Sequence, residues 1–248
     1  AISLDGTRET HNYIRRVPRS FDRVLEGFRV LREMGVYTAA VTSVSKRNLS
    51  ELPEIYEILS VAGVKSWQIQ LIIGEGRMRS NEDMPQPADL EGIARFMVAK
   101  RRTCSMNIYP GDNIGFFTSL ERELRNSPWR GCFAGILSIG IEANGNIKGC
   151  LSQCPEFMEN NPFVEGNIRK KSLREIWENP DGFSYNRKFH LGKVKGFCRT
   201  CKHVKECRCG CTATAYAIHG TKYENSYCIY QCVYNRNRGV PVPTYTPR

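Results

Sequence analysis

The chain has 248 residues, a hydrophobic content of 41% and a formal net charge of +11. This length allows one large or two modest domains, and the composition is ordinary for a globular protein with a real core. No apolar run reaches the roughly 18 to 20 residues of a spanning helix, and the first residues carry no signal-peptide pattern. We therefore expect a cytoplasmic protein with no membrane association.

The first third of the chain alternates between strand and helix patterns. Strands are predicted at residues 1–4, 36–44 and 67–73, and helices between Thr7 and Pro18, Ser20 and Gly35, and Asn48 and Gly63. This order predicts parallel strands with right-handed crossovers, in a doubly wound sheet or in part of a barrel. No Gly-x-Gly-x-x-Gly follows a strand, so the doubly wound version lacks a dinucleotide fingerprint.

Two of these helices carry start signals. Ser20 is expected to cap the second helix, and Asn48 with Glu51 predicts a capping box for the third. The glycine loop at residues 74–77 is interpreted as a turn after the third strand.

Residues 80–130 form a bridge. A polar, proline-bearing linker precedes a predicted helix at residues 88–102, and residues 105–109 are a candidate last strand of the sheet. Cys104, which precedes that strand, is interpreted as a small buried apolar side chain rather than a metal ligand.

Seven cysteines in the last third have a regular spacing. The pattern is Cys132-x12-Gly145-x4-Cys150, then Cys198-x2-Cys201-x5-Cys207-x3-Cys211, then Cys228. Thiolates that share a metal centre must converge, and a tight Cys-x2-Cys turn closed by distant cysteines is typical of iron–sulfur ligation. The spacing therefore predicts an iron–sulfur domain.

Two other uses of the cysteines stay open. A disulfide framework is typical of short secreted chains with cysteines spread along them, whereas residues 1–103 contain none. A zinc ribbon needs about 15 to 20 residues between its two Cys-x2-Cys turns. Only five residues separate Cys201 from Cys207.

Glycine and asparagine predict the start of this domain. Asn144-Gly145 between residues 136–142 and 146–149 predicts a hairpin with a type I′ turn, which would bring Cys132 and Cys150 to the same end. A helix is predicted at residues 172–179. The cysteine-rich segment 198–211 should lead into another helix.

Basic residues gather over the cysteine-rich segment. They can form a solvated face that balances an anionic cluster, dock an acidic peptide segment or bind nucleic acid. We favour the first interpretation, and nucleic acid is the least favoured partner. The residues are Arg187, Lys188, His190, Lys193, Lys195, Arg199, Lys202, His203, Lys205 and Arg208.

The seven-cysteine pattern resembles the complete signature of SPASM domains, the auxiliary-cluster domains of radical S-adenosylmethionine (radical SAM) maturases. Residues 1–79 resemble the part of the radical SAM barrel that precedes such a domain. The resemblance covers nearly the whole chain and implies an α/β protein. Residues 1–110 would be the C-terminal half of a partial (β/α)6 barrel, 111–130 a bridge, and 131–248 a small α+β SPASM domain.

The resemblance divides the cysteines between two auxiliary 4Fe-4S clusters. The outer group, as we name it here, is Cys198, Cys201, Cys207 and Cys228. The inner group, which would lie nearer the active site, is Cys132, Cys150 and Cys211. Its fourth ligand would be Cys154 or Cys209, or an iron would stay open to substrate. Cys232 is a spare cysteine.

The same resemblance implies a binding face for S-adenosylmethionine. Ser3-Leu4-Asp5-Gly6 with Glu9, His11 and Arg15 resembles the end of the fourth barrel strand and the helix after it, with Asn12 where the family usually has aspartate. Ser3 and Arg15 would contact the ribose and the carboxylate, because strand ends open onto a barrel's active face and a guanidinium binds a carboxylate with two bonds. The other residues assigned to this face are Thr42, Ser43 and Leu71.

Two family features are missing from the sequence. Radical SAM enzymes share a Cys-x3-Cys-x2-Cys loop, but here Phe157 follows Cys150-x3-Cys154 where the third cysteine would stand. We expect a fragment that lacks the first three strands and this loop and is inactive alone; a degenerate, non-catalytic relative would look the same. Leu151 replaces the aspartate that sulfatase-maturing relatives use as a base, so the general base is unassigned.

The function implied is that of a radical SAM oxidoreductase that modifies a peptide or protein by hydrogen abstraction. The product would be a thioether, a carbon–carbon cross-link or an oxidised residue. The full-length protein would hold S-adenosylmethionine and a third 4Fe-4S cluster, with a reducing flavodoxin or ferredoxin as electron donor. The alternatives are a ferredoxin-like electron-transfer module and a zinc-stabilised binding protein.

Overall fold

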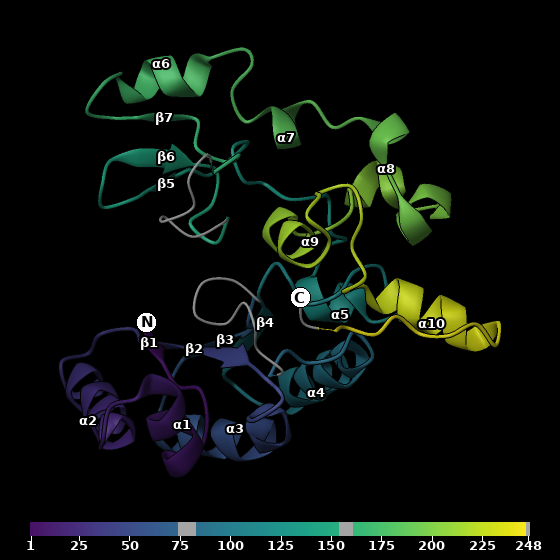
Figure 1. Ribbon diagram of the computed structural model, residues 1–248. Coiled ribbons are helices and arrows are strands. Elements are labelled where there is room, and N and C mark those ends of the chain that lie inside the picture. The colour runs from purple at the N-terminus through teal and green to yellow at the C-terminus, as the bar shows by residue number, and fades with distance from the viewer. Residues whose placement is uncertain (74–82, 154–160, 247–248) are drawn as a thin grey trace. The chain divides into compact units, whose positions relative to one another are not determined.

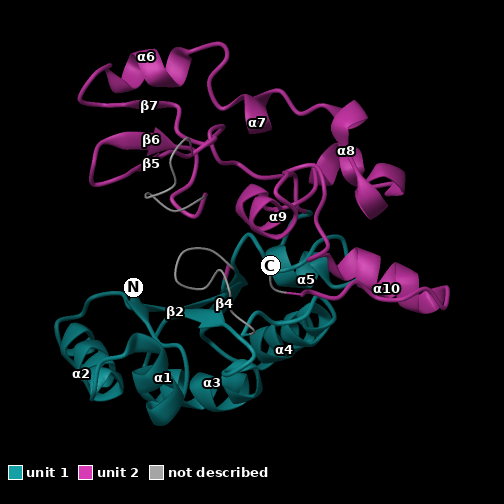
Figure 2. Cartoon of the chain, viewed as in Figure 1, with its two compact units in different colours: residues 1–72, 82–128 teal, residues 73–81, 129–248 magenta. Residues whose placement is uncertain are grey.

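The structure, a computed structural model, describes residues 1–73, 83–153 and 161–246. The chain divides into two compact units (Figure 2). Unit 1 comprises residues 1–72 and 82–128, and unit 2 comprises residues 73–81 and 129–248. Each unit has its own β-sheet. Among the described helices, none is both long and apolar enough to cross a membrane.

Unit 1 is built on a parallel sheet in which the strands follow their order in the sequence, β1-β2-β3-β4. Figure 1 shows α1, α2, α3 and α4 on the same side of this sheet. A doubly wound sheet would carry helices on both faces, whereas a barrel wall carries them on one. The elements are β1 (Ile2–Ser3), α1 (Arg8–Arg15), α2 (Ser20–Glu33), β2 (Ala39–Val44), η1 (Leu49–Glu51), α3 (Leu52–Val61), β3 (Ser66–Leu71), α4 (Asp89–Thr103), β4 (Asn107–Pro110) and α5 (Glu121–Arg125).

The core of unit 1 follows from the side-chain periods of these elements. In β2 the burial alternates along the strand, so one face of the sheet is apolar. Trp67 of β3, Phe28 of α2 and Ile55 of α3 are almost fully buried. Burial of side chains of this size stabilises the fold by roughly 1.5–3 kcal/mol each.

Neither predicted cap in unit 1 makes a capping bond. Ser20 is the first residue of α2 rather than its cap, and its Oγ lies 3.2 Å from His11 Nε2. Asn12 Oδ1 instead accepts the backbone N–H of Phe21. Asn48 does occupy the N-cap of η1, but its amide bonds to backbone groups just beyond β1 and β2 instead of capping the helix.

Unit 2 combines a small antiparallel sheet, β5-β6-β7, with short helices. Ile147, Ile176 and Phe183 form a buried cluster under the sheet. The predicted helix at residues 172–179 is present as α6, with Ser172 in a full capping box with Glu175. The elements are β5 (Gly140–Ile141), β6 (Asn146–Lys148), β7 (Gly166–Asn167), α6 (Leu173–Glu178), α7 (Ser184–Arg187), η3 (Leu191–Lys193), η4 (Gly196–Thr200), α8 (Val204–Cys207), α9 (Thr212–His219) and α10 (Ile229–Asn237).

The predicted hairpin is present, but its turn is not of type I′. That turn needs positive φ at both central residues, whereas here Gly145 has φ +90° and Asn144 is not in the left-handed region. Gly145 N donates to Glu142 O at 2.8 Å, and Glu142 N donates to Asn146 O at 2.9 Å. The loop is therefore one residue longer, a type I turn closed by a left-handed glycine.

Two sequence interpretations lie outside the described residues. These are the glycine loop at residues 74–77 and the role of Cys154.

Asn48 gives a test of the unit 1 fold. Its Nδ2 donates to Asp5 O at 2.8 Å and Ser43 O at 3.0 Å, and its Oδ1 accepts from Ser45 N at 2.7 Å. Asn48→Ala should lower the free energy of unfolding by about 3 kcal/mol, since it leaves buried backbone groups unpaired. Urea unfolding followed by tryptophan fluorescence measures this. Exposed Ser50→Ala is the control, and an equal loss in both variants would contradict the prediction.

Candidate functional site

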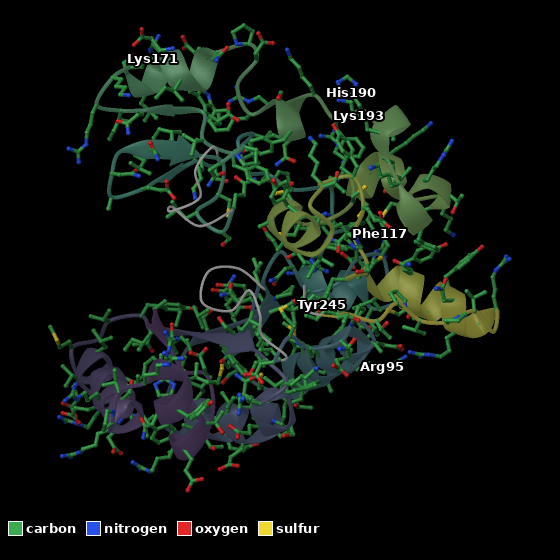
Figure 3. All side chains as sticks on the ribbon, in the orientation of Figure 1. Arg95, Phe117, Lys171, His190, Lys193 and Tyr245 are labelled. Carbon is green, nitrogen blue, oxygen red and sulfur yellow. The ribbon has the colours of Figure 1, made fainter. Side chains whose placement is uncertain are left out.

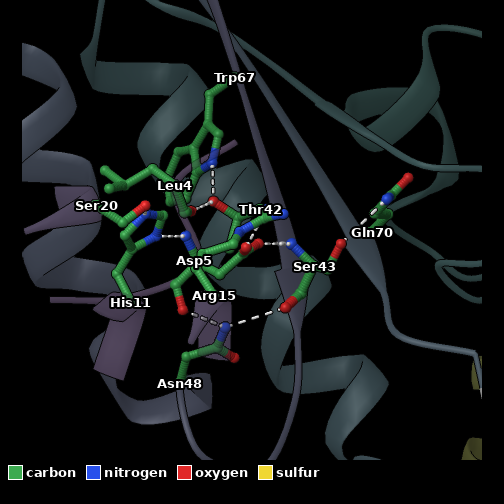
Figure 4. A network of polar contacts seen from close by, with 10 residues as sticks. All are labelled: Leu4, Asp5, His11, Arg15, Ser20, Thr42, Ser43, Asn48, Trp67 and Gln70. Atoms are coloured by element: carbon green, nitrogen blue, oxygen red, sulfur yellow. Dashed lines mark hydrogen bonds and ion pairs between the residues drawn. The ribbon is translucent and has the colours of Figure 1, made fainter. Parts of the chain in front are cut away.

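In unit 1 a buried carboxylate organises the ends of the first two strands (Figure 4). Asp5 follows β1 and is 2% exposed. Its Oδ1 accepts from Ser43 N at 2.9 Å, and its other oxygen pairs with the guanidinium of Arg15. Asp5 thereby ties β1 to β2 and holds Arg15 at the carboxyl edge of the sheet.

A buried histidine supports this carboxylate. His11 Nδ1 accepts from Asp5 N at 3.0 Å, so its proton is on Nε2, which faces Ser20 Oγ at 3.2 Å. Burial lowers the pKa of His11, and nearby Arg15 acts in the same direction. The imidazole is therefore neutral at pH 7 and serves as a spacer between α1, α2 and β1.

The residues assigned to the S-adenosylmethionine face differ in whether their polar groups are already hydrogen-bonded or buried. The hydroxyl of Thr42 donates to Leu4 O at 2.6 Å and accepts from Trp67 Nε1 at 2.8 Å. Leu71 is buried, and its backbone N–H bonds to Asn113 Oδ1 at 3.0 Å.

The remaining three are partly accessible. Ser3 is partly exposed in β1, the Ser43 hydroxyl accepts from Gln70 Nε2 at 3.2 Å, and Arg15 is 39% exposed. The binding roles of all five residues stay predictions.

In unit 2 the outer group gathers around the segment from η4 to α8. Burial, then the charges of Cys228 and Cys198, raise the pKa of Cys207 well above its usual value. Burial likewise raises the pKa of Cys228, on which Cys198 and Cys201 act in the same direction. These four thiols are therefore close enough for the charge of one to act on another.

An unusual backbone turn connects the outer group to α9. Arg208, Cys209 and Gly210 all have positive φ, at +51°, +64° and +73°. The left-handed conformation costs about 1–2 kcal/mol for each residue other than glycine. It persists only where the surroundings fix it, and such strain concentrates at functional sites.

Cys209 and Asn225 hold this turn in place. The interaction of Cys209 with Cys198 lowers the pKa of Cys198 and raises that of Cys209, and the Cys198 thiol lies 3.9 Å from Asn225 O. Asn225 is buried; its Nδ2 donates to Cys209 O at 3.1 Å and its Oδ1 accepts from Tyr227 N at 2.9 Å. These contacts associate Cys209 with the outer group, while its role as an inner ligand stays a prediction.

The inner group is assembled by a close approach of two backbones. A Cβ on Gly149 would lie 2.7 Å from the carbonyl carbon of Ala134, so only glycine fits there. This contact brings the segments that carry Cys132 and Cys150 side by side. Asn186 adds the third segment, because its Nδ2 donates to Ala134 O at 2.8 Å and its Oδ1 accepts from Thr212, which follows Cys211, at 2.9 Å.

A polar network supports Cys150. Gln153 is fully buried; its Oε1 accepts from Cys150 N at 3.0 Å and from the Tyr185 hydroxyl at 3.1 Å. The same hydroxyl accepts from Gly149 N at 3.0 Å. Lys148 Nζ donates to Gln153 O at 2.9 Å and pairs with Glu142 at 2.5 Å.

The chemistry of these thiols fits an iron–sulfur centre. The cysteines that the structure describes are free thiols, and Cys211 and Cys228 occupy the N-caps of α9 and α10, where the helix dipole favours a thiolate. Buried thiols with raised pKa values become thiolates when iron binds, which couples binding to proton release. In the described part of the chain, no three His, Cys, Asp or Glu side chains converge as they would on one ion.

Sequence reasoning missed the residues that hold the cysteine segments. These are Asn186, Asn225, Gln153 and Tyr185. The sequence offered one signal, the position of Asn225 three residues before Cys228, and nothing marked the other three.

Most of the basic stretch is solvated. Figure 3 shows His190 and Lys193 side by side, and both are exposed. Lys188 pairs with Asp181 at 2.7 Å, and Arg187 Nε donates to Gly135 O at 2.7 Å. Local contacts therefore use part of this charge and leave the rest on the surface.

Comparison with known proteins places the chain in a family. A family model described as an iron–sulfur cluster-binding domain, SPASM, matches residues 132–203. The AdoMet-dependent heme synthase of Methanosarcina barkeri is 30% identical over 246 residues, which cover 93% of this chain and 67% of that protein. The chain belongs to the radical SAM enzymes with a SPASM domain. The resemblance seen in the sequence is thus confirmed.

Further relatives of this SPASM-containing chain are more distant. The mycofactocin maturase MftC of Mycobacterium tuberculosis is 24% identical, and the match covers 87% of this chain and 53% of that protein. The crystal structure of Streptococcus suis SuiB superposes with a TM-score of 0.66 at 17% identity, over 92% of this chain and 54% of SuiB. Tagged anSMEcpe with bound AdoMet gives 0.63 at 19% identity, over 95% and 63%. The predicted fold class is confirmed, and the chain spans about half to two thirds of these proteins.

Tyr185→Phe tests the support of the inner group. Loss of the hydroxyl leaves the buried Gly149 N–H unpaired, so we expect the free energy of unfolding to fall by about 1–3 kcal/mol. Urea unfolding measures it. Tyr234→Phe, at a ring that is 36% exposed, is the matched control and should change stability by less than about 0.5 kcal/mol. Equal effects of the two substitutions would show that the hydroxyl has no such role.

Proposed function

We propose that this protein acts as a radical SAM oxidoreductase whose unit 2 holds two auxiliary 4Fe-4S clusters. The observation that carries the proposal is the presence, in one unit, of free cysteines whose backbone segments are held together by buried contacts. Membership of the SPASM-containing family supports it. The ferredoxin-like alternative shares the clusters but would not bind S-adenosylmethionine.

The proposed ligands are the two cysteine groups. Cys198, Cys201, Cys207 and Cys228 would hold one cluster, and Cys132, Cys150 and Cys211 the other. When bound, S-adenosylmethionine supplies a 5′-deoxyadenosyl radical that removes a hydrogen atom, and the clusters supply one-electron transfer. The residues of unit 2 exclude water from the buried thiols and fix their positions.

In unit 1 the proposed role of the strand-end network is to orient a carboxylate. Asp5 holds Arg15 by one ion pair, so the remaining guanidinium donors keep a fixed direction. Ser3, in the adjacent strand, would contact the ribose. The preorganised network reduces the entropy lost when the cofactor binds.

Two substrate classes have support. A peptide or protein is the substrate implied by the sequence pattern, and SuiB bound to the precursor peptide SuiA and the maturase MftC belong to the same set of relatives. A tetrapyrrole is favoured by identity, since the relatives at 30% and 25% are both AdoMet-dependent heme synthases. Coproporphyrin III separates the two: a shift of its absorbance on titration would support the tetrapyrrole, and no shift in a protein that binds S-adenosylmethionine would favour the peptide.

The proposed electron donor is a reducing flavodoxin or ferredoxin. Exposed Lys195, Arg199 and Lys202 lie on the segment that carries the outer group. Clustered exposed charge of one sign accelerates encounter with an oppositely charged protein and loses its effect at high salt.

Substitution of Cys201 tests the cluster assignment. Anaerobically reconstituted protein should contain about eight irons with matching sulfide, and Cys201→Ala should lower this to about four. Cys104→Ala is the control, because the Cys104 thiol lies in unit 1 and donates to Met106 O. Unchanged iron in Cys201→Ala would refute the ligand assignment, and one or two zinc ions without colour would indicate the zinc-stabilised binding protein.

Arg15→Gln tests the cofactor site in the full-length protein. Loss of one charged hydrogen bond to a carboxylate should weaken S-adenosylmethionine binding about 10- to 100-fold, as measured by equilibrium dialysis. The control is Arg16→Gln, at the neighbouring exposed residue, which should leave the affinity for S-adenosylmethionine unchanged. Equal affinities of both variants and the parent would remove Arg15 from the site.

A further inference from the structure

Lys222 is a buried cation without a hydrogen-bond acceptor. Its side chain is 8% exposed, and its Nζ has no partner among the residues that the structure describes. Lysine is almost never buried without a paired group, and an unsatisfied buried donor needs an explanation. An ammonium in this position indicates a negative charge that the protein chain itself does not supply.

Three aromatic rings surround this ammonium. Its Nζ lies 5.1 Å from the ring centroid of Tyr223, 5.6 Å from that of Phe189 and 5.8 Å from that of Tyr185. The faces of such rings attract a cation. A ring face is not a conventional hydrogen-bond acceptor, so the three N–H donors of the ammonium stay without one among the described residues.

Tyr185 relates the ammonium to the inner group, because its hydroxyl accepts from Gly149 N at 3.0 Å and donates to Gln153 Oε1, which also accepts from Cys150 N. Burial lowers the pKa of Lys222 to about 8, with Lys193 and Arg208 acting in the same direction and Cys209 and Cys132 acting against them. Cys132 belongs to the inner group. Lys222 also lies three residues before Asn225, whose Nδ2 donates to Cys209 O at 3.1 Å.

We propose that Lys222 is a positioning residue whose ammonium, caged by rings that include Tyr185 of the network around Cys150, makes the auxiliary clusters easier to reduce. This inference rests on the proposed function. A cluster with thiolate ligands gains negative charge on reduction, and its potential follows net charge and nearby hydrogen bonds. In the step an external donor gives one electron to the oxidised cluster, and no bond to Lys222 forms or breaks.

The test is a redox titration of the reconstituted protein with dithionite, followed by electron paramagnetic resonance. Lys222→Met keeps the length of the side chain and removes the charge. It should shift the equilibrium of reduction about tenfold toward the oxidised form, which is about 59 mV for one electron. Lys222→Arg should restore the parent potential. Exposed Lys171→Met removes a charge of the same sign at the surface and should shift the potential much less, because water and salt screen it.

Each outcome decides something different. Removal of an unpaired buried charge does not by itself destabilise a fold, so iron content should be unchanged in Lys222→Met; if it falls, Lys222→Gln serves in its place. Equal potentials at equal iron content would overturn the inference and leave the proposed function intact. No iron in the parent protein would overturn the proposed function and, with it, the inference.

Discussion

The mutual repulsion of closely held sulfur ligands is the constraint on which unit 2 depends. Thiolates grouped in a dry region repel one another, and burial adds the cost of removing each charge from water. The chain meets this cost with neutral polar contacts that fix the backbone: the close approach of Gly149 to Ala134, and the amides of Asn186 and Asn225. Rigidity is thus provided by groups that add no charge of their own.

In unit 1 a buried charge is stabilised by a charged partner rather than by neutral amides. Here a buried carboxylate, Asp5, is neutralised by Arg15 and by the backbone N–H of Ser43, while a neutral imidazole fills the space behind it. The charge that remains at the strand ends is the guanidinium, which is partly exposed. A partly exposed cation that Asp5 holds against a strand end suits recognition of an anionic ligand, whereas cysteines that are buried or half-buried suit a cofactor shielded from water.

The sequence predicted the elements with strong periodicity and the cysteines with close spacing, and it failed where a polar side chain had several possible partners. Helices α2 and α4 follow from hydrophobic period, and strand β2 follows from its β-branched residues. Asn48 looked like a helix cap, yet its amide bonds to the backbone at two strand ends, at Ser43 nearby in sequence and at distant Asp5. Gln153 and Lys222 carried no signal, since their importance arises only from what folding brings next to them.

The left-handed turn at Arg208, Cys209 and Gly210 has a consequence for electron flow. It joins Cys207 to Cys211, which we assign to different groups, and four residues span at most about 14 Å even when fully extended. Tunnelling rates fall exponentially with distance, so a covalent limit on the gap between two redox centres also limits how slow their exchange can become. The turn would therefore keep a ligand of each centre within a fixed backbone distance of a ligand of the other, and so favour electron transfer between them.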